Sequence, residues 1–276
     1  MKDPKDLNFY EILSYSTTRI ECKLKNGGHS TGTGFFLFLN DFENKNEKER
    51  IVIITNKHVI ENAEEGKLTL TTKKNGKILN TEHFSIPHEN FESAWIPHPD
   101  DSVDLCLLNF NPYENIFQEK EIELFYTPIP CQMIPNKEVI ETFDTLEDVI
   151  MIGYPNGIWD SYNNKPIFRK GVTATDYRLD YNNKAEFIID MAVFGGSSGS
   201  PILTTKRFLD QDDNEITRTF LLGILYAGFQ HTANGEIKIV EIPQTQKAFV
   251  RTSIPNNLGI VIKAEELNVF RKMFYG

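Results

Sequence analysis

Three separate segments of the sequence carry residues that could act together as a nucleophile, a base and an orienting acid. His58 follows the apolar run 51–55, Asp104 directly precedes the apolar run 105–108, and Ser198 lies in the glycine-rich segment 195–201. A serine hydroxyl is a weak nucleophile that needs a base within hydrogen-bond reach, and imidazole can shuttle its proton near neutral pH. A carboxylate then fixes the imidazole tautomer and stabilises the imidazolium. We therefore predict Ser198 as nucleophile, His58 as general base and Asp104 as the acid that orients the base.

The apolar runs around these segments indicate the elements that position them. Short stretches rich in Ile, Val, Phe and Thr alternate with turn signals, and helical patterns are scarce. An irregular stretch with several prolines, 110–140, separates a first set of strands from a second, and 264–274 has the apolar stripe of a helix. Two sets of short strands favour paired β-barrels. The expected strands include 34–39, 51–55, 68–72, 105–108, 149–152, 171–174, 187–189, 202–204 and 220–225.

The bulk composition is that of an ordinary globular protein with an acidic surface. The chain has 276 residues, of which 40% are hydrophobic and 25% are charged, and its formal net charge is −10. A chain of this size buries most of the surface that its unfolded form exposes, so its core needs no covalent staples. The net negative charge argues against a nucleic-acid partner, because phosphate contacts need clustered lysine and arginine side chains.

The cysteines and the N-terminal segment favour a reducing compartment. Cys22, Cys106 and Cys131 are odd in number and widely spaced, which is not the pattern of a disulfide framework. Residues 1–13 lack the apolar core of a signal peptide, and no stretch approaches the ~18 apolar residues of a membrane span. We therefore expect a cytoplasmic protein with no membrane partner.

The motifs around the three candidate residues resemble those of a known family. Thr-Asn-Lys-His-Val ends at position 59, Asp-Leu-Cys-Leu-Leu begins at position 104, and Gly-Ser-Ser-Gly-Ser-Pro covers 196–201. They are similar to the three catalytic motifs of the chymotrypsin clan of serine proteases, in the clan's order of histidine, aspartate and serine. The histidine motif is nearer to bacterial Deg-type heat-shock proteases and stand-alone trypsin-like peptidases than to the digestive enzymes. The resemblance extends loosely over residues 15–255, and we expect no PDZ domain after it.

The resemblance implies an all-β fold of two packed six-stranded antiparallel β-barrels of the chymotrypsin type, followed by a short C-terminal helix. The histidine and the aspartate belong to the first barrel and the serine to the second. The expected domain ranges are 1–125, 126–262 and 263–276. The resemblance further implies a serine endopeptidase that acts through an acyl-enzyme, takes a protein or peptide substrate, and needs no metal or cofactor.

The same resemblance places an oxyanion hole and a substrate pocket beside Ser198. The backbone N–H groups of Gly196 and Ser198 would stabilise the negative charge that develops on the carbonyl oxygen. Ala192 stands six residues before the serine, where trypsin-type enzymes have a charge-selecting aspartate, so an uncharged substrate side chain is favoured. Asp190 lies two positions away and leaves a basic preference open. The other expected pocket residues are Tyr226, Ala227 and Gly228.

Ser197 replaces an aspartate that digestive members place before the nucleophile and pair with a new N-terminus after zymogen cleavage. That activation switch is therefore not expected. Regulation by loop ordering on binding of an activating protein partner is the alternative, and the turn-rich loop 153–170 is the candidate element. A plain surface loop explains the same composition.

Two other functions stay open at this point. Residues 195–199 also fit the nucleophile elbow of an α/β-hydrolase, in which Ser197 would be the nucleophile and Asp213 and His231 its partners. That fold needs a helix after the serine, where this sequence favours a strand. The other alternative is a catalytically silent binding module built on the same barrels.

Further acidic residues and histidines compete for roles. Asp100 or Asp101 could replace Asp104 as the orienting acid, although only Asp104 leads directly into the apolar run. A metal ion could also bind a group of side chains in one irregular stretch, although the spacing of these residues in the sequence does not follow the pattern of a known metal site. The residues of this metal hypothesis are His83, His88, His98 and Asp100.

Overall fold

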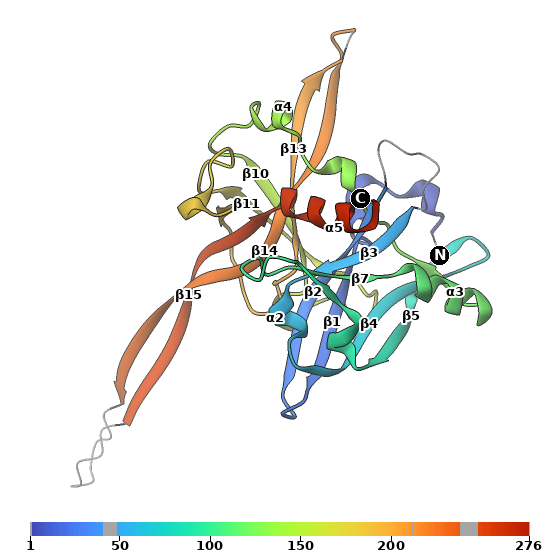
Figure 1. The fold of residues 1–276 in the computed structure, drawn as a ribbon, viewed down its shortest axis with the longest axis horizontal. Helices are drawn as coiled ribbons and strands as arrows, with labels where there is room; N and C mark the ends of the chain where they lie inside the picture. Colours follow the sequence, from blue (N-terminus) through green and yellow to red (C-terminus); the bar gives the residue numbers. More distant parts are fainter. Residues whose placement is uncertain (1, 41–48, 211, 238–247, 276) are drawn as a thin grey trace.

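The computed structural model places most of the chain in two β structures that lie side by side (Figure 1). It describes residues 2–40, 49–210, 212–237 and 248–275. The N-terminal half forms the first structure and the C-terminal half forms the second. The predicted all-β class is therefore confirmed.

The N-terminal half folds into one nine-stranded sheet. Seven strands follow the order β5-β4-β1-β2-β3-β7-β6, while β8 pairs with β4 and β9 pairs with β2. The sequence leads us to expect six strands here, and three of the nine are only two or three residues long, too short for an apolar run to reveal. The bounds are β1 (Thr17–Leu24), β2 (His29–Leu39), β3 (Arg50–Thr55), β4 (Ala63–Lys74), β5 (Lys77–Glu89), β6 (Ile96–Pro97), β7 (Cys106–Asn109), β8 (Glu123–Phe125) and β9 (Ile129–Pro130).

The C-terminal half is a closed six-stranded barrel, as predicted, with the strand order β10-β11-β12-β15-β14-β13. Two of its strands, β14 and β15, continue beyond the barrel as a paired ribbon that projects from the body of the molecule (Figure 1). The bounds are β10 (Asp148–Gly153), β11 (Ile167–Thr173), β12 (Glu186–Asp190), β13 (Pro201–Leu209), β14 (Glu215–Ile237) and β15 (Ala248–Lys263).

Short helices connect the strands, and one further helix follows the last strand. None of the helices in the described ranges is long and apolar enough to cross a membrane. The α-helices are α1 (Phe9–Leu13), α2 (Lys57–Ile60), α3 (Asn111–Glu119), α4 (Lys137–Ile140) and α5 (Leu267–Tyr275). The 3-10 turns are η1 (Pro4–Asp6), η2 (Phe91–Ala94), η3 (Cys131–Met133), η4 (Pro155–Gly157), η5 (Tyr181–Asn183) and η6 (Ala264–Glu266).

One buried apolar cluster extends across both halves. The first sheet contributes Leu37 and Val52, the barrel contributes Ile152 and Ile224, and the C-terminal helix α5 contributes Phe270. Full burial of one such side chain contributes about 1.5–3 kcal/mol to folding. The predicted C-terminal helix therefore packs on the seam between the halves and holds them in a fixed relation (Figure 1).

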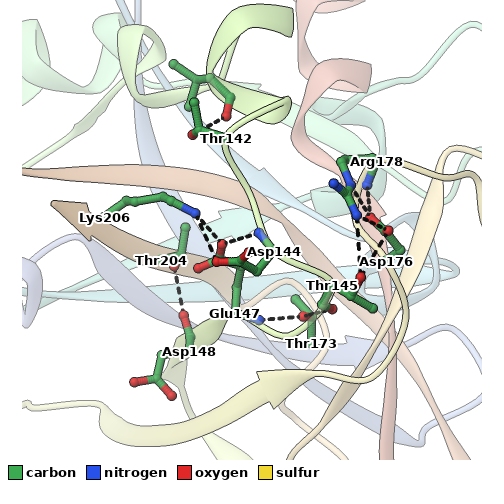
Figure 2. A network of polar contacts seen from close by, with 11 residues as sticks. Thr142, Asp144, Thr145, Glu147, Asp148, Thr173, Asp176, Arg178, Thr204 and Lys206 are labelled. Atoms are coloured by element: carbon green, nitrogen blue, oxygen red, sulfur yellow. Dashed lines mark hydrogen bonds and ion pairs between the residues drawn. The ribbon is translucent and has the colours of Figure 1, made fainter. Parts of the chain in front are cut away.

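The chain passes from the first half to the second between residues 131 and 147, and the last part of this passage is fastened to the barrel (Figure 2). The Lys206 ammonium donates to the Glu147 carboxylate at 2.6 Å. The buried Thr173 hydroxyl donates to the Thr145 carbonyl at 2.9 Å and accepts the Glu147 N–H at 2.9 Å. These contacts define the entry to β10. The domain limits at 125 and 262 remain a prediction.

Candidate active site

The His58 ring and the Asp104 carboxylate form the most direct pair in the candidate site. The ring Nδ1 lies 2.6 Å from Asp104 Oδ2, and the backbone N–H of His58 donates to Asp104 Oδ1 at 3.2 Å. Because an ionised carboxylate only accepts hydrogen bonds, the pair assigns the proton of the neutral ring to Nδ1. Nε2 is then left as an acceptor on a ring whose side chain is 44% exposed. The pair therefore fixes the orientation of the ring and leaves Nε2 able to accept a proton.

Strand pairing explains why two residues 46 positions apart meet. β3 and β7 are antiparallel neighbours with Thr55 opposite Cys106, so the end of β3 lies beside the start of β7. His58 follows β3 on the short helix α2, and Asp104 precedes β7. The buried Asn56 strengthens this junction, because its side-chain amide donates to the Asp104 carbonyl at 2.7 Å.

Ser198 lies in a tight turn, residues 195–200, that we call the nucleophile turn. Gly196 and Gly199 have φ values of 81° and 85°, in the left-handed region that side chains other than glycine rarely adopt. A Cβ atom at Gly199 would collide with the Thr33 carbonyl oxygen, and one at Gly196 would approach the Tyr154 carbonyl. The two glycines therefore let the turn pack closely against the rest of the molecule.

Two backbone N–H groups of this turn have no hydrogen-bond acceptor among the described residues. Within the described ranges, neither the Gly196 N–H nor the Ser198 N–H donates a hydrogen bond to another residue. The carbonyl before each of them is held, because Gly195 accepts from the Asn156 N–H at 2.5 Å and Ser197 accepts from Ser200 at 3.1 Å. In a trans peptide the N–H points away from the carbonyl, so both N–H groups point away from these partners. Fixed donors of this kind stabilise a developing oxyanion.

The serine hydroxyl and the histidine ring are not joined by a hydrogen bond in the part of the chain that the structure describes. Ser198 Oγ instead donates to the Tyr226 carbonyl at 3.4 Å. Thr33 links the two segments, because its carbonyl accepts from the Thr55 hydroxyl at 2.8 Å while its N–H donates to the Ser198 carbonyl at 2.8 Å. A hydrogen bond between Ser198 and His58 Nε2 would require the hydroxyl to rotate away from the Tyr226 carbonyl, and such contacts in active sites often tighten only when substrate binds.

A cavity of about 320 Å³ opens beside Ser198, and we call it the Ser198 cavity. Tyr226, Ala227 and Gly228 line it, as the sequence leads us to expect. Ala192 is not among the lining residues, and its neighbour Val193 takes that place, with Cγ1 3.1 Å from the position of a Cβ on Gly228. The remaining lining residues are Asn156, Phe194, Gly195, Leu225 and Phe229.

The residues that line the Ser198 cavity help to distinguish the two substrate preferences that the sequence leaves open, for an uncharged or for a basic side chain. None of its lining residues is charged. Asp190, at the end of β12, is exposed and lies outside the lining set. A larger cavity of about 1110 Å³ lies between β4, β5 and α3 and contains none of the three candidate catalytic residues, so size alone does not mark the site.

The loop 154–166, within the segment 153–170 predicted as a regulatory candidate, contacts both halves. Its Asn156 holds the nucleophile turn, as described above, while its far end is attached to the first sheet. The Lys165 ammonium donates to Ser14 Oγ at 2.9 Å and lies over the Tyr15 ring. The Trp159 ring stacks under a guanidinium of β1, that of Arg19, at 4.0 Å.

We predict that Lys165 makes the stability of the protein depend on pH. Burial lowers the pKa of Lys165 to about 7, against the opposing effect of the Glu11 and Asp160 carboxylates. The unfolded chain keeps this lysine protonated up to about pH 10.4. Between pH 7 and about pH 10.4 the unfolded state therefore binds one more proton than the folded state, so the free energy of unfolding rises with pH in this window.

The measurement is the melting temperature of the wild type and of Lys165→Met from about pH 6 to about pH 9.5. The wild type should gain stability relative to the variant as the pH rises above 7, with little relative change below it. A difference between the two proteins that stays constant over the whole range would contradict this prediction.

The residues of the α/β-hydrolase alternative lie in surroundings that do not suit that role. Ser197 is fully buried, its hydroxyl has no partner among the described residues, and the strand β13 follows where an α/β-hydrolase needs a helix. Asp213 lies between β13 and β14. The His231 side chain lies outside the described part of the structure.

Most of the other acidic residues and histidines considered as alternatives make contacts of their own, apart from Ser198. Asp100 accepts from the Ser102 hydroxyl at 2.7 Å, and Asp101 is exposed. His98 is buried and accepts the Asp100 N–H at 3.2 Å, whereas His83 and His88 lie on β5. Over the described ranges, no group of three or more His, Cys, Asp or Glu side chains is arranged to hold a metal ion. The three cysteines are free and buried.

Comparisons with known proteins were made for the sequence and for the structure. A family model described as the trypsin-like peptidase domain matches residues 32–208. No curated protein is similar enough in sequence to be matched to the chain.

Several solved structures are similar to this chain. The HtrA-type protease AlgW with tripeptide has 16% identity and a TM-score of 0.49, over 95% of this chain and 60% of that one. The Rv3671c protease in its inactive form has 16% identity and a TM-score of 0.45, over 95% and 90%. The MamO protease domain from Magnetospirillum magneticum has 12% identity and a TM-score of 0.45, over 95% and 98%. The chain thus spans less than two thirds of AlgW.

Proposed function

We propose that this chain, which belongs to the trypsin-like peptidase family, is a serine endopeptidase that hydrolyses peptide bonds through an acyl-enzyme on Ser198. One observation carries the proposal: the 2.6 Å pair between His58 and Asp104, in a chain whose family match includes all three candidate residues. The pair supplies an oriented base, and the nucleophile turn supplies a partly exposed serine.

The chemistry follows from these groups. His58 Nε2 takes the proton of the Ser198 hydroxyl as the oxygen attacks the scissile carbonyl, and Asp104 stabilises the imidazolium that forms. The Gly196 and Ser198 N–H groups receive the negative charge of the tetrahedral intermediate. The imidazolium then gives its proton to the leaving amine, and water releases the acyl group by the same route in reverse.

The Ser198 cavity supports a preference for uncharged substrate side chains. Val193, Phe194 and Phe229 supply apolar surface, and a charged side chain placed there would lose its hydration without gaining an ionic partner. We therefore propose that the enzyme cleaves after apolar residues, with Tyr226, Ala227 and Gly228 along one wall. Ala192 no longer has a proposed role in the pocket.

We also propose that the activity is regulated. The Ser198 hydroxyl is hydrogen-bonded to the Tyr226 carbonyl and not to His58, and the loop 154–166 joins the nucleophile turn to the N-terminal half. A protein partner or a substrate that moves this loop or occupies the Tyr226 carbonyl would release the hydroxyl. A cytoplasmic location stays a prediction.

The direct test is covalent labelling with a fluorophosphonate probe, which reacts only with a serine that a base has activated. The wild-type protein should be labelled, and Ser198→Ala should not. If folded wild-type protein is not labelled, with or without peptide substrate, the chain is a silent binding module and the proposal fails.

A further inference from the structure

Thr33 lies where the first sheet meets the nucleophile turn. It belongs to β2 and is fully buried. β3 pairs with β2 only between Phe35 and Leu39, so the edge of β2 at Thr33 is free of β3. The nucleophile turn occupies this edge, because the Thr33 N–H donates to the Ser198 carbonyl at 2.8 Å. The serine is therefore attached to a strand of the opposite half.

The Thr33 hydroxyl makes two further contacts with the same region. It donates to the Gly196 carbonyl at 3.0 Å and accepts the Tyr154 N–H at 3.1 Å. A hydroxyl has one hydrogen to donate and lone pairs to accept, so this single group can satisfy a carbonyl and an amide together. A methyl group of the same size could satisfy neither.

The contacts of Thr33 hold the peptide planes that adjoin those carrying the proposed oxyanion donors. Four successive peptide planes run from Gly195 to Gly199, and each has its carbonyl oxygen held by one donor. In chain order these donors are the Asn156 N–H, the Thr33 hydroxyl, the Ser200 N–H and the Thr33 N–H. Thr33 alone holds two of the four planes. Its hydroxyl holds the plane of the Gly196 carbonyl, which lies between the plane that carries the Gly196 N–H and the plane that carries the Ser198 N–H.

We propose that Thr33 is a positioning residue for the hydrolysis, and that its hydroxyl keeps the Gly196 and Ser198 N–H groups aimed at one point. This inference rests on the proposed function. Thr33 does not touch the substrate; it acts through the turn. Because oxyanion stabilisation operates in the transition state, losing it lowers kcat while KM changes little.

The test compares Thr33→Val, which removes the hydroxyl at nearly constant volume, with Thr33→Ser, which keeps it. A displacement of reacting groups by about 1 Å can cost ~10²-fold in rate. We expect Thr33→Val to lower kcat for a peptide substrate, and the rate of fluorophosphonate labelling, by about 10- to 100-fold. Thr33→Ser should restore most of the wild-type rate.

Thr173→Val is the matched control. Thr173 is also fully buried, and its hydroxyl also donates to one carbonyl and accepts one N–H, in the network that fastens the entry to β10 (Figure 2). Both variants therefore lose a buried hydroxyl with two backbone partners, but only Thr33 holds the nucleophile turn. Activities are compared well below the melting temperature of each variant, so that a difference in stability alone does not change them.

The outcomes separate the inference from the proposed function. If the wild type is labelled and Thr33→Val has the same kcat as Thr173→Val, or if Thr33→Ser does not restore the rate, Thr33 is only structural and the inference is overturned. If the wild type is not labelled, the proposed function itself fails and kcat is not a usable measure.

Hydrogen exchange measured by mass spectrometry covers that second case and does not depend on activity. Exchange at residues 195–200 should become faster in Thr33→Val and stay unchanged in Thr173→Val. Equal exchange in both variants overturns the inference. If Thr33→Val does not fold, Thr33→Ala removes the same hydroxyl without adding bulk, and the same comparisons apply.

Discussion

Replacing Ser198 with alanine is expected to lower kcat for peptide hydrolysis by about 10⁶-fold, because loss of the nucleophile in enzymes of this chemistry has an effect of that size. The fold should be retained, since the serine hydroxyl has one contact in the described structure, the 3.4 Å hydrogen bond to the Tyr226 carbonyl. The measurement is turnover of a fluorogenic peptide with an apolar residue before the scissile bond, beside the melting temperature of each protein.

Ser197→Ala is the neighbouring control for this prediction. The Ser197 hydroxyl is buried and without a partner among the described residues, so its removal should leave most of the turnover. If Ser197→Ala abolished hydrolysis and Ser198→Ala did not, the nucleophile assignment would be wrong. If both variants kept the wild-type rate, the observed hydrolysis would come from a contaminant.

The pairing of His58 with Asp104 could be predicted because each residue adjoins an apolar run that the sequence makes obvious. The runs become β3 and β7, and their antiparallel pairing turns a separation of 46 residues into a contact of 2.6 Å. The serine was recognisable for a different reason, since only glycine tolerates the φ values that the structure gives to Gly196 and Gly199. Short motifs therefore sufficed to select the candidate catalytic residues.

The residues that hold the nucleophile turn were harder to predict. Asn156 acts through its backbone N–H, a group that nearly every residue type supplies, so no side-chain pattern marks it. Thr33 stands in the short segment Gly-Thr-Gly-Phe, residues 32–35. Its hydroxyl contacts come from residues more than 120 positions away. Such contacts depend on how the two halves pack, which local sequence does not encode.

The pocket shows a related limit. The sequence placed Ala192 in the wall by counting back from Ser198, whereas the structure places Val193 there. Neighbouring side chains of an irregular segment point in different directions, so an error of one position exchanges one wall residue for another. Asp190, the last residue of β12, is exposed and also lies outside the cavity.

Replacing Asp104 with asparagine is expected to lower kcat by about 10⁴-fold while the fold stays intact. The carboxylate accepts two hydrogen bonds from His58, one from ring Nδ1 and one from the backbone N–H. An asparagine has only one acceptor oxygen, so it cannot satisfy both. If the oxygen faces the backbone N–H, the amide NH₂ faces Nδ1 and drives the proton to Nε2, where the ring can no longer act as a base. If the oxygen faces Nδ1, the NH₂ faces the backbone N–H and pushes α2 away.

Asp101→Asn is the matched control for this substitution, because it neutralises an exposed carboxylate three residues away. It should leave kcat/KM close to the wild-type value, and both variants should melt close to the wild type. A near-normal rate for Asp104→Asn would move the orienting role to another acid. Asp100 would be the next residue to test, although its carboxylate already accepts from the Ser102 hydroxyl and N–H. A large loss confined to Asp104→Asn would instead show that the geometry of this one pair, and not the negative charge of the whole loop, orients His58 toward Ser198.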